Sequence, residues 1–457
     1  MLILYYLCPR KFRNLLLLAV SLLFYAWGEP VYILLMLFTI AVDYASGLLI
    51  DLFKRREKQG LARATLIVTV VINLGLLGFF KYTDFLIGAI DSLTGLGLGL
   101  LRIALPIGIS FYTFQTLSYT IDVYWGNVRV QKNPIDFAMF VTFFPQLIAG
   151  PIVRYSDIEN ELSGRKENPE QFVRGVFRFL VGLGKKVILA DRIGAVFEAI
   201  SKYDTGELTT VMAWTGALAF MFQIYFDFSG YSDMAIGMGQ MFGFTFPENF
   251  DYPYEATSIT DFWRRWHMTL SGWFREYLYI PLGGNRKGKA RQILNLFIVW
   301  ALTGLWHGAD WNFLLWGLYF FFILFLEKTF LLKLLDKCPK FVRHLYSFLL
   351  ILFGWVIFSV SDLPEMGAWF AAMFGFGAGF SSGMSWYYLV TRLALFVLLA
   401  IGSTHYPAKF AEWLVDRLKL SENAKVVVRA VFSFALLFPS VMLLVSDSYS
   451  PFLYFRF

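Results

Sequence analysis

The chain has 457 residues, of which 58% are hydrophobic and only 16% are charged, and its net charge is +7. Soluble domains contain roughly 25% charged residues, so this composition excludes an ordinary soluble protein and indicates a membrane protein. The positive charge does not indicate nucleic-acid binding, because the basic residues occur in short clusters between apolar stretches. Such clusters mark cytoplasmic loops, which places the basic segment 10–13 on the cytoplasmic side.

Apolar stretches recur along almost the whole chain. A helix needs about 20 apolar residues to cross the ~30 Å hydrocarbon core of a bilayer. The candidate spans cover residues 14–28, 31–51, 64–88, 103–124, 137–152, 174–200, 211–226, 293–308, 311–332, 344–361, 385–402 and 426–446. Several are short or interrupted, so we expect about eleven transmembrane helices, together with re-entrant and interfacial helices. The predicted fold is all-α and multi-pass, with one domain covering residues 1–457.

Prolines and a glycine interrupt the apolar stretch at 143–151, which reads FFPQLIAGP. A broken or re-entrant helix is tolerated at membrane depth only where it is buried in protein or lines a cavity. Pro145, Gln146 and Gly150 are therefore candidates for the wall of a channel. An ordinary proline kink is the alternative interpretation.

The longest polar interval is 246–291, and it contains the sequence DFWRRWH at 261–267. Its interleaved aromatic and charged residues predict an amphipathic helix that lies on the inner membrane surface. In this interpretation Trp263, Trp266, Trp273 and Phe274 lie at the headgroup level, and the arginines extend to water.

A histidine lies where a membrane helix normally holds only apolar residues. The sequence GLWHGADWN at 304–312 contains His307 between two apolar runs, 293–302 and 313–326. An ionisable ring at that depth is usually functional, although a neighbouring carbonyl could simply satisfy it. Gly304 and Gly308 would let backbone or a narrow ligand approach the imidazole. We expect four aromatic rings to exclude bulk water from it: Trp306, Trp311, Phe313 and Trp316.

The other three histidines carry weaker signals. His267 follows two arginines and is either functional or an interfacial polar residue, and His344 and His405 are expected to be solvated. A metal site is not predicted, because His267 and His307 are the only plausible ligands and no third ligand lies at a helical offset. Cys8 and Cys338 do not alter this conclusion, because neither has a metal-ligand partner at a useful spacing.

A second polar cluster, QIYFDFSGYSD, occupies residues 223–233. Asp227 and Asp233 could anchor an arginine, orient a histidine or belong to a proton path, and structural pairing is the commoner role of such residues. Two short motifs are rejected as decoys. The sequence GGNRKGK at 283–289 resembles a P-loop but is followed by Ala290 instead of Ser or Thr, and GFSSG at 379–383 lacks the α/β sheet of a hydrolase.

Longer motifs resemble the membrane-bound O-acyltransferase family, in particular its alginate O-acetyltransferase branch. They are SLLFYAWG at 21–28, LPIGISFYTFQ at 105–115, FFPQLIAGPIVR at 143–154, residues 261–284, the WHGA core at 306–309 and PFLYFRF at 451–457. The teichoic-acid D-alanylation branch shares the RWH and WHG sequences, but 281–288 and 309–312 are more similar to the acetylating branch.

The resemblance implies a fold in which helices surround a central tunnel, in the cytoplasmic membrane of a bacterium. It implies that His307 is the catalytic histidine and that His267 faces the same tunnel, where it orients the acyl carrier or stabilises the oxyanion. The remaining candidates for the tunnel lining are Trp306, Trp311, Asn312, Asp310, Gln115, Pro145, Gln146, Gly150 and Asp227. Arg286, Lys287 and Lys289 are candidates for holding the donor's phosphates.

The implied reaction transfers an acetyl group from a cytosolic thioester, acetyl-CoA in the first instance, towards an extracytoplasmic polysaccharide. Acetyl-CoA would be a substrate, and no bound cofactor is expected. A secreted or membrane-anchored partner of the SGNH or esterase-like type would complete the transfer to the sugar hydroxyl. D-alanyl transfer from a carrier-protein thioester to teichoic acid is the related alternative. A small-molecule transporter is the alternative from another class, although no inverted repeat supports it.

Overall fold

The computed structural model describes residues 1–446 together with 452 and 453. Within these residues the secondary structure is helical, and the one extended pairing is an isolated antiparallel bridge between Phe250 and Trp266. The prediction of an all-α fold is confirmed for this part of the chain. The family-like segment 451–457 lies outside the described residues except for Phe452 and Leu453.

The chain divides into two compact units, each assembled from segments that are distant in sequence. Unit 1 comprises Met1–Val176, Ala235–Glu248 and Gly272–Leu278, and unit 2 comprises Phe177–Met234, Asn249–Ser271 and Tyr279–Phe457. The expectation of one domain covering residues 1–457 stays a prediction.

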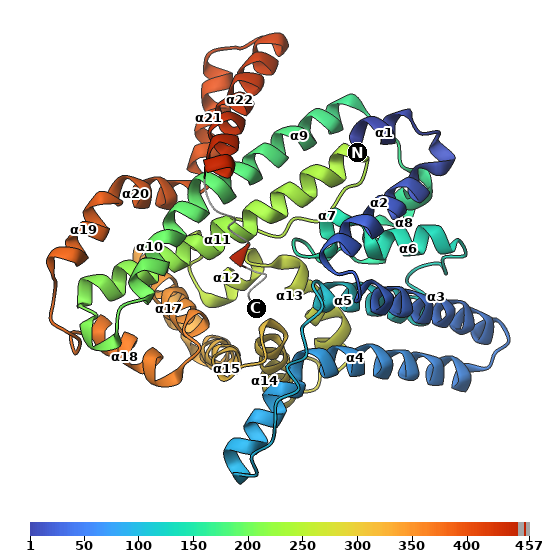
Figure 1. Cartoon of the computed structure of the whole chain (residues 1–457), viewed down its shortest axis with the longest axis horizontal. Coiled ribbons are helices and arrows are strands. Elements are labelled where there is room, and N and C mark those ends of the chain that lie inside the picture. Colours follow the sequence, from blue (N-terminus) through green and yellow to red (C-terminus); the bar gives the residue numbers. More distant parts are fainter. Residues whose placement is uncertain (447–451, 454–457) are drawn as a thin grey trace. The chain divides into compact units, whose positions relative to one another are not determined.

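Unit 1 contains the amino-terminal helices (Figure 1). These are α1 (Leu2–Leu7), α2 (Arg13–Gly28), α3 (Ile33–Arg55), α4 (Gln59–Thr94), α5 (Ile109–Trp125), α6 (Pro134–Thr142), α7 (Phe144–Leu147), α8 (Tyr155–Gly164) and the start of α9 (Pro169–Gly184). Helices α3, α4 and α5 pack together. The buried Asp43 of α3 ties them, because it accepts hydrogen bonds from Asn73 Nδ2 at 2.9 Å and Thr120 Oγ1 at 2.8 Å.

Unit 2 contains most of the remaining helices. They are α10 (Asp191–Ser201), most of α11 (Thr210–Met241), α12 (Ile259–Arg265), the start of α13 (Met268–Phe274), α14 (Lys289–His307), α15 (Trp311–Leu326), α16 (Leu332–Leu335), α17 (Lys340–Ser359), α18 (Leu363–Met373), α19 (Gly383–Thr391), α20 (Leu393–Gly402), α21 (Tyr406–Arg417) and α22 (Glu422–Ser446). Its core is rich in aromatic side chains from α11, α12, α15 and α17.

Five helices among the described residues are long and apolar enough to cross a membrane, or six if the bent pair α19–α20 forms one span. They are Ile33–Arg55, Gln59–Thr94, Thr210–Met241, Lys340–Ser359 and Ala424–Ser446. The count of eleven is not confirmed. Helices α2, α5 and α15 have 16, 17 and 16 residues, fewer than the about 20 that a perpendicular span needs. A π-helical turn at Lys185–Ala190 also interrupts the span predicted at 174–200.

The stretch predicted at 137–152 is broken. Helix α6 ends at Thr142, the four-residue helix α7 follows, and residues 148–154 are not helical until α8 begins at Tyr155. Pro145 lies in the first turn of α7, where its missing N–H is tolerated. Most of the non-helical residues are buried, so the segment is a true break in the helix and more than a proline kink.

The prediction of a surface helix at 261–267 is wrong. Helix α12 ends at Arg265, and Trp263 and Trp266 are 9% and 2% exposed. The Trp263 ring packs edge-on against Trp316 of α15 at 5.5 Å, and the Trp266 ring lies 4.7 Å from Trp355 of α17. A sequence in which aromatic and charged residues alternate is compatible with a membrane surface and with a protein interior. Here α15 and α17 pack against α12, so the segment lies in the interior.

Candidate active site

His267 lies in the break between α12 and α13, with a backbone φ of 44°. Two backbone hydrogen bonds hold this break against the segment after Glu248: Asp251 N–H donates to the Arg265 carbonyl at 2.9 Å, and Met268 N–H donates to the Asn249 carbonyl at 3.0 Å. A left-handed conformation at a residue other than glycine persists only where its surroundings enforce it, and such residues cluster at functional sites.

The contacts of Asn249 determine which nitrogen of His267 carries the proton. The Asn249 Oδ1 atom accepts a hydrogen bond from the Thr269 hydroxyl at 2.9 Å and from the Thr269 backbone N–H at 3.4 Å. A backbone N–H can only donate, so this amide oxygen is an acceptor. The His267 Nδ1 atom, 3.2 Å from the same oxygen, is therefore the protonated nitrogen, and Nε2 carries the lone pair.

The His267 ring is 1% exposed. Burial lowers the pKa of its imidazole to about 3, so the ring is neutral at cellular pH. Its Nε2 atom is buried and has no hydrogen-bond partner among the described residues. Asn249 Nδ2 donates to Ser232 Oγ of α11 at 3.0 Å, which anchors the whole arrangement to a long helix. The site thus holds a fixed, neutral hydrogen-bond acceptor in a dry environment.

His307 is the last residue of α14 and is 6% exposed. Its ring has edge-on contacts with Trp306, Trp316 and Phe358, with centroids 5.1, 5.1 and 5.4 Å away. Trp306 also contacts His267, at 5.9 Å. The two histidines therefore share one aromatic environment within unit 2, although 40 residues separate them in sequence.

Glycines place His307 by letting α14 and α15 approach closely. A Cβ atom on Gly304 would lie 2.3 Å from the Phe313 carbonyl oxygen, and one on Gly317 would lie 2.4 Å from the Trp300 carbonyl oxygen. A Cβ on Gly308 would lie 2.1 Å from the Phe313 ring. The structure thus fills the space beside Gly304 and Gly308 with α15, so of the two predicted neighbours, backbone or a narrow ligand, it is another helix that approaches there.

Replacing Gly304 with alanine is expected to lower the free energy of unfolding by about 1–3 kcal/mol, because the added methyl group forces α14 and α15 apart. Thermal or denaturant unfolding in detergent measures the change. Gly75→Ala is the matched control, because Gly75 lies within α4 and nothing surrounds its missing side chain within 4 Å. Equal stability of both variants would contradict this account of the helix pair.

The residues after Ala309 form the N-terminus of α15, with Asp310 as its N-cap and Trp311 as its first residue. The Asp310 carboxylate accepts a hydrogen bond from the Trp311 N–H at 2.6 Å and caps the helix. Asn312 is buried, and its Nδ2 donates to the Phe358 carbonyl at 2.9 Å, which fixes α15 to the end of α17. Trp311 is half exposed, unlike Trp306 and Trp316.

Sequence reasoning missed Glu327, which positions the start of α12. It lies in a π-helical turn between α15 and α16 and is 1% exposed. Its carboxylate accepts hydrogen bonds from the backbone N–H groups of Ile259 and Thr260 at 2.7 and 2.8 Å, and from the Tyr346 hydroxyl at 3.1 Å. A lone glutamate at the end of an apolar stretch was the available signal, but its partners are distant in sequence.

Glu327→Gln is expected to lower the free energy of unfolding by about 1–3 kcal/mol, because an amide nitrogen replaces one oxygen that accepts from backbone N–H groups. The measurement is thermal melting of the purified protein. Glu412→Gln, at an exposed position of α21, removes the same charge and should leave the melting temperature unchanged. A Glu327→Gln protein as stable as the control would show that this cap contributes little.

The two aspartates of α11 are paired. Asp227 is 2% exposed and lies 2.7 Å from Lys186 Nζ, and it accepts a hydrogen bond from the Leu453 N–H at 2.9 Å. Asp233 lies 2.9 Å from Arg178 and 2.7 Å from Lys185. Both ion-pair networks therefore connect α11 to the segment 178–186. This supports a structural role for the two aspartates.

Gln115, Pro145, Gln146 and Gly150 lie in unit 1, where each is buried. Both side-chain polar atoms of Gln115 lack a hydrogen-bond partner within the described residues. Gln146 Nε2 donates to the Phe140 carbonyl at 2.8 Å, whereas its Oε1 has no partner in this part of the chain. A buried amide without partners is costly, so a ligand or water would stabilise these groups.

The basic loop with Arg286, Lys287 and Lys289 is exposed, and it is joined to the start of α14. Asn295 Nδ2 donates to the Gly284 carbonyl at 2.9 Å. His307 lies at the other end of the same helix, roughly 27 Å away at 1.5 Å per residue. The loop follows no β-strand, so the rejection of a P-loop stands.

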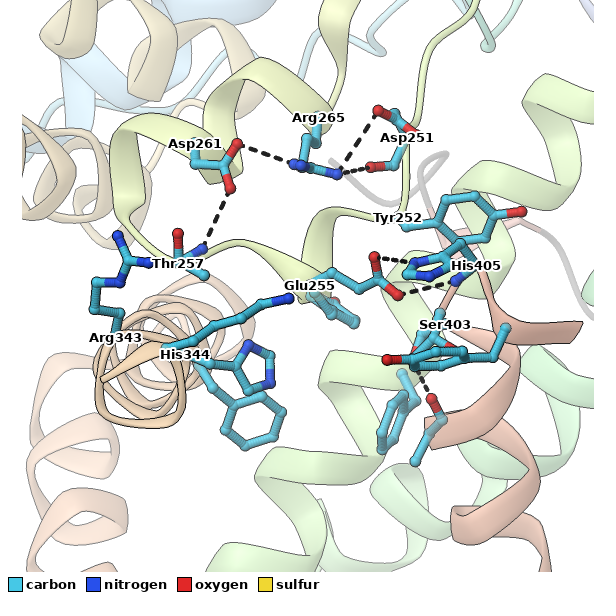
Figure 2. Close-up of a pocket in the computed structure, with 17 residues that line it drawn as sticks. Asp251, Tyr252, Glu255, Thr257, Asp261, Arg265, Arg343, His344, Ser403 and His405 are labelled. Atoms are coloured by element: carbon cyan, nitrogen blue, oxygen red, sulfur yellow. Dashed lines mark hydrogen bonds and ion pairs between the residues drawn. The ribbon is translucent and has the colours of Figure 1, made fainter. Parts of the chain in front are cut away.

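His344 and His405, which were expected to be solvated, are partly exposed, and each also has a partner within the chain. His405 Nδ1 lies 2.7 Å from the Glu255 carboxylate (Figure 2). His344 Nδ1 lies 3.3 Å from the Ala256 carbonyl. Both rings are partly buried. Among the described residues, no group of three or more His, Cys, Asp or Glu side chains is arranged to hold a metal ion.

Comparison with known proteins decides the family. Residues 128–363 match the model of the membrane-bound O-acyltransferase family, and this range contains both buried histidines. A probable alginate O-acetylase of Azotobacter vinelandii is 39% identical over 99% of this chain and 96% of its own length. The chain belongs to the membrane-bound O-acyltransferase family. It is therefore an acyltransferase and a membrane protein.

Two further relatives of this O-acyltransferase show the range of acceptors. A peptidoglycan O-acetyltransferase of Helicobacter pylori is 38% identical over 78% of this chain and 72% of its own length. A teichoic acid D-alanyltransferase of Bacillus subtilis is 29% identical over 47% of this chain and 56% of its own length. Their names give peptidoglycan and teichoic acid as the acceptors, and acetyl and D-alanyl as the groups transferred.

Proposed function

We propose that this protein is an O-acetyltransferase that passes an acetyl group from a cytosolic thioester, acetyl-CoA, across the bacterial cytoplasmic membrane to modify an extracytoplasmic polysaccharide. The observation that carries the proposal is the 39% identity to a probable alginate O-acetylase over 99% of the chain. The D-alanyltransferase match covers 47% of the chain at 29% identity, which favours acetyl transfer over D-alanyl transfer.

His307 is the proposed general base. The attacking hydroxyl oxygen forms a bond to the thioester carbonyl carbon as the neutral imidazole takes its proton, and the carbon–sulfur bond then breaks. The imidazolium returns the proton to the departing thiolate, so the histidine is regenerated. A positioned base of this kind contributes roughly 10²–10⁴-fold. The surrounding rings of Trp306, Trp316 and Phe358 limit competing hydrolysis by water.

His267 has a different proposed role. Its Nε2 atom carries a lone pair and accepts hydrogen bonds, so in this tautomer it cannot donate to an oxyanion. With a pKa of about 3 it is also a poor base. It is suited to orient a hydroxyl or amide N–H of a substrate by accepting a hydrogen bond. This geometry favours orientation over oxyanion stabilisation.

The donor's phosphates bind the basic loop at 286–289 in this reaction, because the loop is exposed and lies at the opposite end of α14 from His307. The acceptor would approach His307 from the extracytoplasmic side. A secreted or membrane-anchored partner of the esterase type completes the transfer to the sugar hydroxyl. Gln115 and Gln146, with unpartnered buried atoms in the described structure, are proposed to line the passage.

The test is a reconstituted transfer assay. The purified full chain in lipid vesicles is given radiolabelled acetyl-CoA together with an esterase-like protein encoded beside it and a polysaccharide acceptor. The proposal is supported if label appears on the partner or on the polymer only when the acyltransferase is present. A parallel reaction with a D-alanyl carrier-protein thioester separates the two branches, because label transferred only from that donor would assign the chain to D-alanyl transfer.

A further inference from the structure

A cavity of about 760 Å³ lies within unit 2, apart from the two catalytic candidates. Three segments form most of its walls, and Phe222 of α11 completes them: the segments are the chain at 251–265, the first turns of α17 and the junction between α20 and α21. Figure 2 shows Arg343 and His344 on one helix, with the Glu255–His405 pair on the other side of the space. Nothing in the proposed transfer reaction uses this cavity.

The acidic side chains that line the cavity already have cationic or N–H partners. Asp261 accepts from Arg265 Nε at 3.0 Å, and Asp251 lies 3.7 Å from the same guanidinium group. Glu255 accepts from the His405 backbone N–H at 2.9 Å in addition to its contact with the ring. Each of these carboxylates therefore has a hydrogen-bond or ion-pair partner on the walls formed by 251–265 and by α20–α21, and Asp251 and Asp261 share the guanidinium group of Arg265.

The wall formed by α17 contributes two basic side chains and no acidic one to the lining of the cavity. Lys340 is exposed and has no ion pair among the described residues. Arg343 has only a distant contact, 3.6 Å, with Asp336, whose side chain is 73% exposed. The Nε atom of Arg343 is buried and lacks a hydrogen-bond partner in this part of the chain. Two cations and a buried donor therefore face a cavity whose own acids are occupied.

The position of this wall identifies the class of ligand. Helix α17 is one of the helices long and apolar enough to span a membrane, and Lys340 is its first residue. A basic residue at that point lies at the level of lipid headgroups, and the basic segment 328–343 marks this side as cytoplasmic. Basic pockets between membrane helices on the cytoplasmic side bind anionic headgroups, and arginine binds phosphate oxygens bidentately.

We propose that this cavity binds a phosphate group, supplied by the headgroup of an anionic phospholipid of the inner leaflet. Lys340 and Arg343 hold the phosphate, and the partly buried His344 lies beside it. Because Asp251 and Arg265 line the cavity and also pair through their backbones next to His267, an occupied cavity reinforces the segment that holds His267.

The test measures binding of short-chain phosphatidylglycerol to the purified full chain in a neutral detergent. Short-chain phosphatidylcholine, whose headgroup has no net charge, is the reference ligand. The double variant Lys340→Gln/Arg343→Gln is compared with Lys333→Gln/Lys337→Gln, which removes two exposed charges near the same helix but outside the cavity. Lys340→Gln alone is included because this side chain has no ion pair in the described structure.

The cavity variant is expected to bind phosphatidylglycerol at least about tenfold more weakly than the parent. The affinity of the single variant should lie between those of the cavity variant and the parent. The affinity of the control should change less than twofold. Acetyl-CoA is titrated in parallel. If the cavity variant bound only acetyl-CoA more weakly, the cavity would still be a phosphate site, but its ligand would be a soluble phosphate ester. Equal weakening in the control, or no weakening of either ligand, would overturn the proposal.

Discussion

Replacing His307 with glutamine is expected to lower the rate of acetyl transfer by about 10²–10⁴-fold, because an amide cannot take the proton of the attacking hydroxyl. The ring is 6% exposed and surrounded by Trp306, Trp316 and Phe358, so no water-borne base replaces it easily. The measurement is the initial rate of label transfer from acetyl-CoA in the reconstituted assay.

Glutamine is chosen for this test because its volume and polarity are close to those of histidine. The His307→Gln protein should therefore keep the melting temperature and elution volume of the parent, which separates loss of chemistry from loss of folding. A variant that is folded and retains a tenth or more of the parent's rate would show that His307 is not the base.

The second large effect is expected at His267. Leucine at this position removes the lone pair of Nε2, and we expect transfer to fall about 10–100-fold, the equivalent of one buried hydrogen bond of roughly 1–3 kcal/mol. Glutamine is the matched comparison. Like leucine, it must adopt the positive φ of this position, but it carries an acceptor oxygen near the position of Nε2. His267→Gln should keep at least several-fold more activity than His267→Leu.

The pH dependence of this pair is also informative. Since burial holds the pKa of His267 at about 3, the ring does not titrate between pH 5 and 8. The activity of His267→Gln should therefore follow the parent's pH profile over this range, at a lower level. An ionisation that disappears with His267 would contradict its assignment as a neutral acceptor. Equal rates for the glutamine and leucine variants would show that packing alone is lost.

The candidate site shows where sequence reasoning is strong. His307 could be singled out because an imidazole between two apolar runs is rare at membrane depth. His267 was ambiguous, since interleaved tryptophans and arginines fit a membrane surface as well as an interior. The structure buries the segment beneath α15 and α17 and brings Trp306 against both rings.

Distant partners account for most of what could not be predicted. Glu327 caps α12 from 68 positions away, and Glu255 holds His405 from 150 positions away. No pattern of periodicity encodes such pairs, because each depends on how helices pack and not on the local chain. The predicted number of membrane spans is not confirmed for a related reason: apolar stretches such as 174–200 satisfy a length rule, whereas in the structure a π-helical turn lies within this one.

The sequence by itself determined the membrane class, the helical fold and the family-like motifs, and it singled out His307 as the candidate base. These follow from composition and local pattern, which record how each residue partitions between water and hydrocarbon. Only the tertiary structure decided that Gly304 and Gly308 serve helix packing, that Nδ1 of His267 carries the proton, and that the cations of α17 face a cavity. Each of these depends on the direction and distance of a group on another segment, and a linear pattern of residue types carries no information about either.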